Sequence, residues 1–210
     1  MRDLEKYRGV FPAFYACYDE AGEISPKRVR ELTRYCIRKG VKGVYVNGSS
    51  GECIYQSVED RKTVLENVME AAEGRLTVIA HVACNNTRDS EALARHAESL
   101  RVDAVAAIPP IYFHLPEYAI ARYWNDISAA APNTDFVIYN IPQLAGVALT
   151  LPLFREMRKN PRVIKEILRI NEDLDIGGVR PPLPELTESD GPIVQEAAAM
   201  IRRAREEALA

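Results

Sequence analysis

Short apolar runs alternate with segments of helical periodicity through the first 160 residues of the chain. The runs are apolar on both faces, which is typical of parallel strands covered by helices. The apolar residues between them recur at helical spacing. The expected strands are 9–17, 41–48, 77–83, 104–110 and 136–142, and the expected helices are 25–40, 57–74, 87–100, 116–131 and 150–160.

Capping residues support the bounds of these helices. Ser25 can cap the first helix, Pro26 suits its first turn and Gly40 suits its end. Ser57 can cap the second helix, with Asp60 three residues further on. The pattern therefore predicts βα units in series rather than a mixed or all-helical chain.

After residue 160 this alternation stops. Residues 164–174 follow helical spacing, a proline-rich connector follows at 179–191, and 192–209 reads as a last helix. Five βα units fit either a doubly wound sheet or part of a (β/α)8 barrel. No GxGxxG motif follows the first strand, which weakens the dinucleotide-binding alternative. Both folds stay open on the pattern alone, with βα units over 1–164 and a helical extension over 165–210.

Composition excludes several classes of protein. The net charge of -3 shows no basic stripe for nucleic acid, and no apolar run approaches the roughly 18 residues of a membrane helix. The N-terminus has no apolar run long enough for a signal peptide. The four scattered cysteines predict reduced thiols in a cytoplasmic protein. His81 and Cys84 are close in sequence, but no second ligand pair follows, so we expect no metal site.

Candidate chemistry lies in three loops after strands, where parallel βα proteins bind ligands. The loop 47–52 places Ser49 and Ser50 between two glycines, as a carboxylate-binding loop or a simple tight turn. Tyr112 follows the fourth strand, as a site residue or a packing aromatic. Tyr139 lies at the fifth strand and can relay a proton if its hydroxyl faces a pocket. Otherwise it is a core residue.

Taken together, these loops resemble those of the pyruvate lyases that include dihydrodipicolinate synthase and N-acetylneuraminate (sialic acid) lyase. The resemblance rests on Gly48-Ser49-Ser50-Gly51-Glu52, on Tyr139-Asn140-Ile141-Pro142 and on Tyr112 between them. The segment "YNIPQLAG" is similar to the sialic acid lyase branch, whereas the synthase branch usually has two threonines in the first loop.

This resemblance implies a (β/α)8 barrel and cleavage of sialic acid to pyruvate and N-acetylmannosamine through a Schiff base on a lysine. It implies that Ser49 and Ser50 hold the pyruvyl carboxylate and that Tyr139 is the general acid/base. It implies that Tyr112 supports the proton relay, reaching a neighbouring subunit's site. No metal or organic cofactor is expected, the substrate is a small molecule, and the family suggests a homotetramer.

The family's Schiff-base lysine is missing from its expected place. Position 167 is isoleucine, and Lys165 matches the family's later helix rather than its sixth strand. A barrel needs about 250 residues, so 210 is short. We expect strands six to eight to be absent after Ile164, and the remaining strands to leave open edges that call for association.

Three alternatives for function stay open. The chain represents a shortened sialic acid lyase, or a fragment or interaction module without catalysis, or an enzyme that uses Lys165. Another pyruvate-dependent aldolase, similar to dihydrodipicolinate synthase, is a further variant of the first alternative.

Overall fold

The computed structural model describes residues 5–157, 191, 192, 194–196, 198 and 199. Its sheet consists of four parallel strands, β1 (Gly43–Val46), β2 (Thr77–His81), β3 (Ala104–Ala107) and β4 (Asp135–Ile138), which pair in chain order. The helices are α1 (Pro26–Arg38), α2 (Val58–Ala72), α3 (Thr87–Ser99), α4 (Glu117–Ala130), α5 (Pro142–Ala145) and α6 (Leu151–Met157). Two 3₁₀ turns, η1 (Glu5–Tyr7) and η2 (Ser49–Gly51), complete the described elements.

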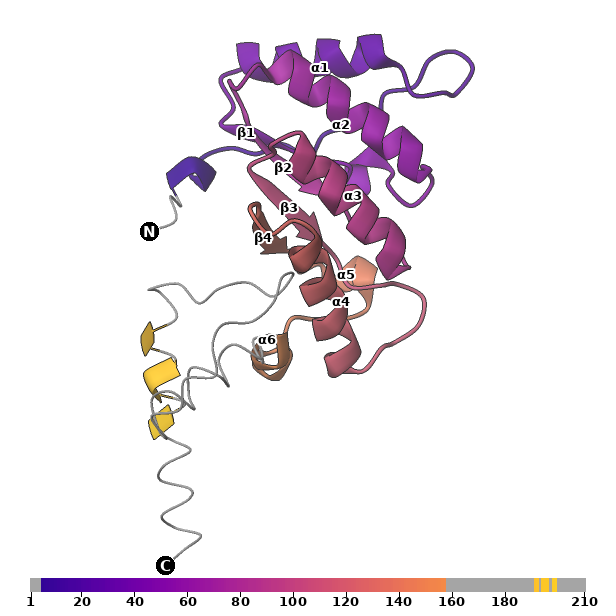
Figure 1. Ribbon diagram of the computed structural model, residues 1–210. Helices are drawn as coiled ribbons and strands as arrows, with labels where there is room; N and C mark the ends of the chain where they lie inside the picture. The colour runs from indigo at the N-terminus through magenta and orange to yellow at the C-terminus, as the bar shows by residue number, and fades with distance from the viewer. Residues whose placement is uncertain (1–4, 158–190, 193, 197, 200–210) are drawn as a thin grey trace, which may run out of the picture.

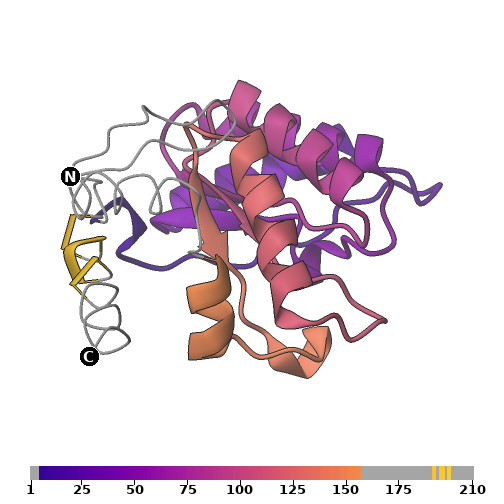
Figure 2. The same ribbon diagram turned by 60° about the horizontal axis from the view of Figure 1, so that its bottom comes forward.

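Helices α1 to α4 lie side by side on one face of the sheet (Figures 1 and 2). Each contacts the next along the chain, and α4 also contacts α6. A doubly wound sheet would carry helices on both faces. Strands in chain order with every crossover helix on one face are the arrangement of a (β/α)8 barrel, here over its first units.

The two faces of the sheet carry different side chains. On the helix side, alternate strand residues such as Val44, Val78 and Val105 are at most 1% exposed and belong to the main core. On the other face, Tyr45 and His81 alternate with them along β1 and β2. The core therefore fixes which side chains point into the interior of the barrel.

The caps predicted for α1 and α2 are confirmed. The Ser25 side chain accepts the backbone N–H of Arg28. At α2 the Ser57 hydroxyl accepts the backbone N–H of Asp60, and the Asp60 carboxylate accepts the backbone N–H of Ser57. This reciprocal pair satisfies two backbone donors that a helix start otherwise leaves free.

The first expected strand, 9–17, does not form a regular strand. It runs beside β1 as a single parallel bridge between Ala13 and Tyr45. The N–H of Phe14 donates to the Tyr45 carbonyl at 2.9 Å, and the N–H of Tyr45 donates to the Pro12 carbonyl at 3.0 Å. Pro12 has no N–H to extend the ladder, which limits pairing here.

The turn η1 packs under the amino-terminal edge of the sheet. The Tyr7 hydroxyl lies 2.8 Å from Asp135 Oδ2, and the Lys6 ammonium lies 3.1 Å from the same carboxylate. Burial, together with the hydrogen bond to Asp135, raises the pKa of Tyr7 to about 12. These contacts join the chain's first described turn to β4, about 130 residues away.

Beyond β4 the prediction was less complete. The short helix α5 was not expected; Pro142 occupies its first turn, and Gly146, at φ +69°, ends it. The helix expected over 150–160 is seen as α6, and residues 158–160 lie outside the described part. Of the expected extension over 165–210, only 191, 192, 194–196, 198 and 199 are described, and they are helical.

Candidate functional site

The loop that follows β1 presents four polar hydrogens together. Asn47 adopts a left-handed φ of 59°, and its buried side-chain amide donates to the Arg61 carbonyl at 2.9 Å. The chain then makes η2, which Glu52 closes by donating its N–H to the Ser49 carbonyl. The backbone N–H groups and hydroxyls of Ser49 and Ser50 have no acceptor among the described residues. The loop is therefore a tight turn that also leaves donors available to an anion.

Tyr45 connects this loop to Tyr139. A Cβ placed on Gly48 would lie 2.6 Å from the Tyr45 ring, so the glycine is what allows the loop to cross that ring. The ring centroids of Tyr45 and Tyr139 are 5.1 Å apart in an edge-to-face arrangement. The structure thus brings Tyr139 and the loop that carries the serines against the same aromatic ring.

Tyr139 lies directly after β4, half-buried, and its N–H donates to the Ala107 carbonyl at 3.0 Å. Its hydroxyl has no hydrogen-bond partner among the described residues. The backbone is therefore fixed by the sheet, whereas the phenol remains available for a proton or a ligand.

His81, at the end of β2, is the third ring of this group. Its centroid lies 6.1 Å from those of Tyr45 and Tyr139. Nδ1 lies 2.9 Å from the Asn47 carbonyl, an acceptor, so this nitrogen carries the proton and Nε2 has the lone pair. Burial and the nearby Arg61 charge lower the pKa of His81 to about 3, although the hydrogen bond to the Asn47 carbonyl acts in the opposite direction and raises it. The imidazole is a neutral, fixed part of the site.

The buried side chain of Arg61 hydrogen-bonds to backbone carbonyls at the end of β2, a role that the sequence did not predict. Its guanidinium, 2% exposed, donates to the carbonyls of His81 at 2.6 Å and Ala83 at 2.8 Å. It also lies 3.2 Å from Cys84 Sγ. A solvated arginine on helix α2 was the ordinary expectation, because the sequence offers no acidic partner that would mark it as buried.

A cavity of about 270 Å³ adjoins Arg61, between the loops that follow β1, β2 and β3, and is lined partly by Cys53 and Cys84. Burial raises the pKa of both thiols, and the Arg61 charge offsets part of that rise. All four cysteines are free thiols, as expected. The described residues contain no group of three side chains suited to a metal ion, and none of their helices is long and apolar enough to span a bilayer.

Tyr112 is not brought to this group. Its side chain is 87% exposed, its φ is +85°, and its ring packs edge-to-face on Phe113 at 4.8 Å. A tyrosine held in this strained conformation projects away from its own core.

No described lysine makes a hydrogen bond, ion pair or ring contact with Tyr45 or Tyr139. Lys6 pairs with Asp135 at the amino-terminal edge of the sheet, and Lys42 lines a cavity at that same edge. Lys27, Lys39 and Lys62 belong to helices α1 and α2 or their caps. Lys165, together with the discontinuity expected after Ile164, lies outside the described residues.

Comparison with known proteins identifies the family. Residues 6–197 match the dihydrodipicolinate synthetase family. The chain belongs to this family. It is 82% identical over 164 residues to N-acetylneuraminate lyase of Mediterraneibacter gnavus, an alignment that covers 78% of this chain and 52% of that protein. It is 38% identical over 160 residues to N-acetylneuraminate lyase 2 of Escherichia coli, covering 75% and 52%.

Solved structures agree with this assignment. A catalytic lysine mutant of Ruminococcus gnavus sialic acid aldolase superposes with a TM-score of 0.74 at 52% identity, covering 99% of both chains. N-acetylneuraminate lyase from Mycoplasma synoviae superposes with a TM-score of 0.67 at 31% identity, covering 74% of this chain and 52% of that one. The chain spans about half the length of the curated relatives it matches. The predicted family and barrel fold are confirmed.

Proposed function

We propose that this chain carries the pyruvate-binding half of an N-acetylneuraminate lyase-type aldolase, which cleaves sialic acid to pyruvate and N-acetylmannosamine. The observation that carries the proposal is that Gly48, which leads into the Ser49–Ser50 turn, and the ring of Tyr139 both contact the ring of Tyr45. The relatives that share this chain's sequence are named as N-acetylneuraminate lyases or a sialic acid aldolase.

In this proposal the pyruvyl carboxylate binds at Ser49 and Ser50. Their N–H groups and hydroxyls have no other described acceptor, so binding requires no internal hydrogen bond to break. The Tyr139 phenol exchanges the proton of the hydroxyl that forms or is consumed at the adjacent carbon. Tyr112, exposed at its loop, serves the same relay from outside this group, in a neighbouring subunit of a homotetramer.

The carbon–carbon step also requires a primary amine, which forms an iminium with the keto carbon and withdraws electrons from the bond that breaks. None of the described lysines makes such a contact with Tyr45 or Tyr139. We therefore propose that residues 1–164 form the partial barrel, that 165–210 form the helical extension, and that the nucleophile is not among the described residues. The enzyme is proposed to act in the cytoplasm on small molecules, without an organic cofactor.

Trapping with borohydride tests the chemical step. The chain is incubated with pyruvate and sodium borohydride, digested and mapped by mass spectrometry. A reduced pyruvyl adduct on a lysine supports the aldolase, and an adduct on Lys165 assigns the nucleophile to that residue. Absence of any adduct contradicts catalysis by this chain.

A second candidate function is pyruvate binding without catalysis. It is favoured because the site offers hydrogen-bond donors for a carboxylate but has no described lysine beside them. Pyruvate binding is followed by calorimetry in the parent, in Ser49→Ala/Ser50→Ala and in Tyr139→Phe. The serine variant should lose binding, whereas Tyr139→Phe should bind pyruvate but lose any cleavage activity. Tyr118→Phe, an exposed tyrosine on α4, is the matched control and should change neither.

A further inference from the structure

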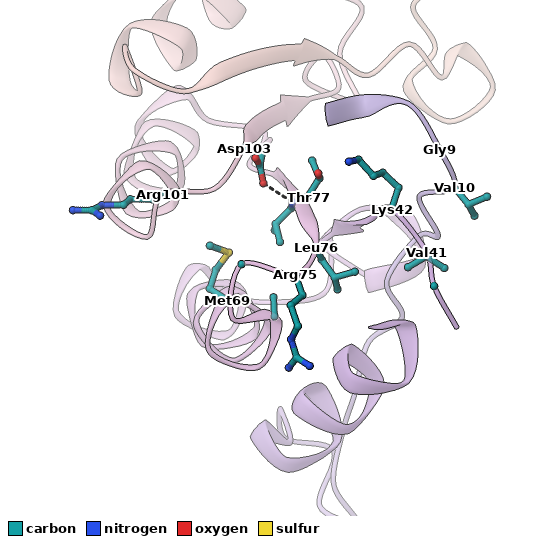
Figure 3. A pocket seen from close by; sticks show the side chains of 14 residues that line it. Gly9, Val10, Val41, Lys42, Met69, Arg75, Leu76, Thr77, Arg101 and Asp103 are labelled. Atoms are coloured by element: carbon teal, nitrogen blue, oxygen red, sulfur yellow. Dashed lines mark hydrogen bonds between the residues drawn. The ribbon is translucent and has the colours of Figure 1, made fainter. Parts of the chain in front are cut away.

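A cavity of about 710 Å³ lies at the amino-terminal edge of the sheet, the end opposite Ser49 and Tyr139 (Figure 3). Its walls come from the segments that lead into β1, β2 and β3 and from the end of α2. Its volume falls in the range of about 300–1,000 Å³ that small-molecule sites occupy. The proposed aldolase chemistry makes no use of it.

Lys42 is held in place at this cavity. A Cβ on Gly9 would lie 2.5 Å from Lys42 Cβ and 3.0 Å from Cγ, so the lysine stem rests on a backbone that has no side chain. Its amine extends across the cavity toward Thr77 and Asp103 (Figure 3). The Lys42 side-chain amine has no hydrogen-bond or ion-pair partner among the described residues.

The charge of the lining is positive although the chain carries a net -3. Lys42, Arg75 and Arg101 line the cavity with one acid, Asp103. The Asp103 carboxylate already accepts the N–H of Val78 at 2.9 Å and lies 4.0 Å from the Lys6 ammonium. Lys6 of η1 therefore partly neutralises the Asp103 carboxylate. The electrostatic potential in the cavity is consequently set mainly by the basic groups.

The two arginines extend from the rim (Figure 3). The Arg101 guanidinium has no partner among the described residues, and the Arg75 guanidinium pairs with Glu73 at 2.9 Å on an exposed surface. Such an exposed pair is weak and can exchange for a ligand. Gly40 and Gly74 leave the rim open, because a Cβ at either position would meet no atom within 4 Å.

We propose that this cavity binds a small phosphate-bearing anion at Lys42 in its interior, and that the side chains of Arg101 and Arg75, which point outward here (Figure 3), turn in from the rim to meet it. Lysine binds phosphate as a point charge and arginine binds it with paired N–H groups. A dianionic phosphoryl group matches the excess of basic groups better than a monocarboxylate such as pyruvate. This proposal does not depend on the aldolase function.

Inorganic pyrophosphate is the probe, and sodium chloride at equal ionic strength is the reference. Calorimetry measures its affinity for the full chain, and amide NMR locates it. We expect shifts at Gly40, Gly74 and Thr77 with pyrophosphate, and at Ser49 and Ser50 with pyruvate. At about ten times the dissociation constant, pyrophosphate should raise the melting temperature by about 3 °C or more.

The variant Lys42→Gln/Arg101→Gln should weaken pyrophosphate binding about tenfold or more, because it removes two of the three basic groups. The matched control Lys27→Gln/Arg34→Gln removes the same charge from exposed positions on α1 and should bind like the parent. If Lys42→Gln/Arg101→Gln has a lower melting temperature without ligand, Arg101→Gln alone replaces it, because Arg101 is exposed. Its pyrophosphate affinity is then compared with that of the control. Equal losses in both variants, or no difference between pyrophosphate and chloride, would overturn the proposal.

Discussion

Acid should destabilise this fold through His81. The imidazole is 2% exposed, and its folded pKa is about 3, against an ordinary 6.5. The neutral form is favoured in the folded state, so this contribution to stability is complete above pH 6.5 and is lost as the pH falls toward 3. The full shift of 3.5 units corresponds to about 5 kcal/mol, and the part lost between pH 7.5 and 5.0 is about 2 kcal/mol.

Urea unfolding at pH 7.5 and 5.0 measures this loss. In His81→Asn the side-chain amide can still donate to the Asn47 carbonyl, but nothing at this position titrates. The variant should be less stable at pH 7.5, because the ring contacts with Tyr45 and Tyr139 are gone. Its loss between the two pH values should, however, be smaller than that of the parent by about 2 kcal/mol.

The exposed His114 provides the control, and His114→Asn should keep the acid sensitivity of the parent. If His81→Asn loses as much free energy of unfolding between pH 7.5 and 5.0 as the parent does, then His81 is not the acid-sensitive group. The assignment of its Nδ1 proton and buried neutral ring would then be wrong.

Three further changes test the packing and the caps by urea unfolding. Trp124→Ala on α4 should cost about 3–5 kcal/mol because the ring is 1% exposed, whereas Tyr118→Ala on the same helix should stay within about 0.5 kcal/mol. Ser57→Ala should cost about 1 kcal/mol by breaking the capping box of α2, and an unchanged stability would contradict that role. Gly43→Ala should cost about 1–3 kcal/mol or more, because its Cβ would lie 2.2 Å from the Thr77 carbonyl and the Phe11 ring; a neutral effect would show that β1 can shift.

The helices and inner strands could be predicted because local signals and burial agree there. Ser57, Asp60 and the apolar spacing of α2 all indicate one helix, and that helix forms. The prediction of a regular strand over 9–17 was wrong because it rested on apolar composition alone. The backbone of this segment pairs only briefly with β1, and Val10 and Tyr15 are 67% and 68% exposed.

The candidate site was only partly accessible to sequence reasoning. Ser49, Ser50 and Tyr139 follow strands, and parallel strands bring such residues to one edge. The contact between the serine loop and Tyr45 depends on the missing side chain of Gly48. The neutral state of His81 depends on its burial and on the charge of Arg61, and the orientation of its ring depends on the Asn47 carbonyl. The contacts of His81 join residues 20 and 34 positions apart, and the contact of Tyr45 with Tyr139 spans more of the chain still, so a single sequence carries no local signal for them.

The edge strand β4 bears on the expectation that open strand edges lead this chain to associate. Its four residues are all half-buried, whereas those of β3 are all fully buried, and among the described residues it pairs only with β3. A strand at the edge of a sheet can serve as a template for further pairing. We therefore expect the chain to associate through this edge and to melt as an associated species. Size-exclusion chromatography with light scattering, followed by thermal melting, measures both. A cooperatively melting monomer of 23.5 kDa would show that β4 is covered within the chain itself, and that its half-buried residues need no partner.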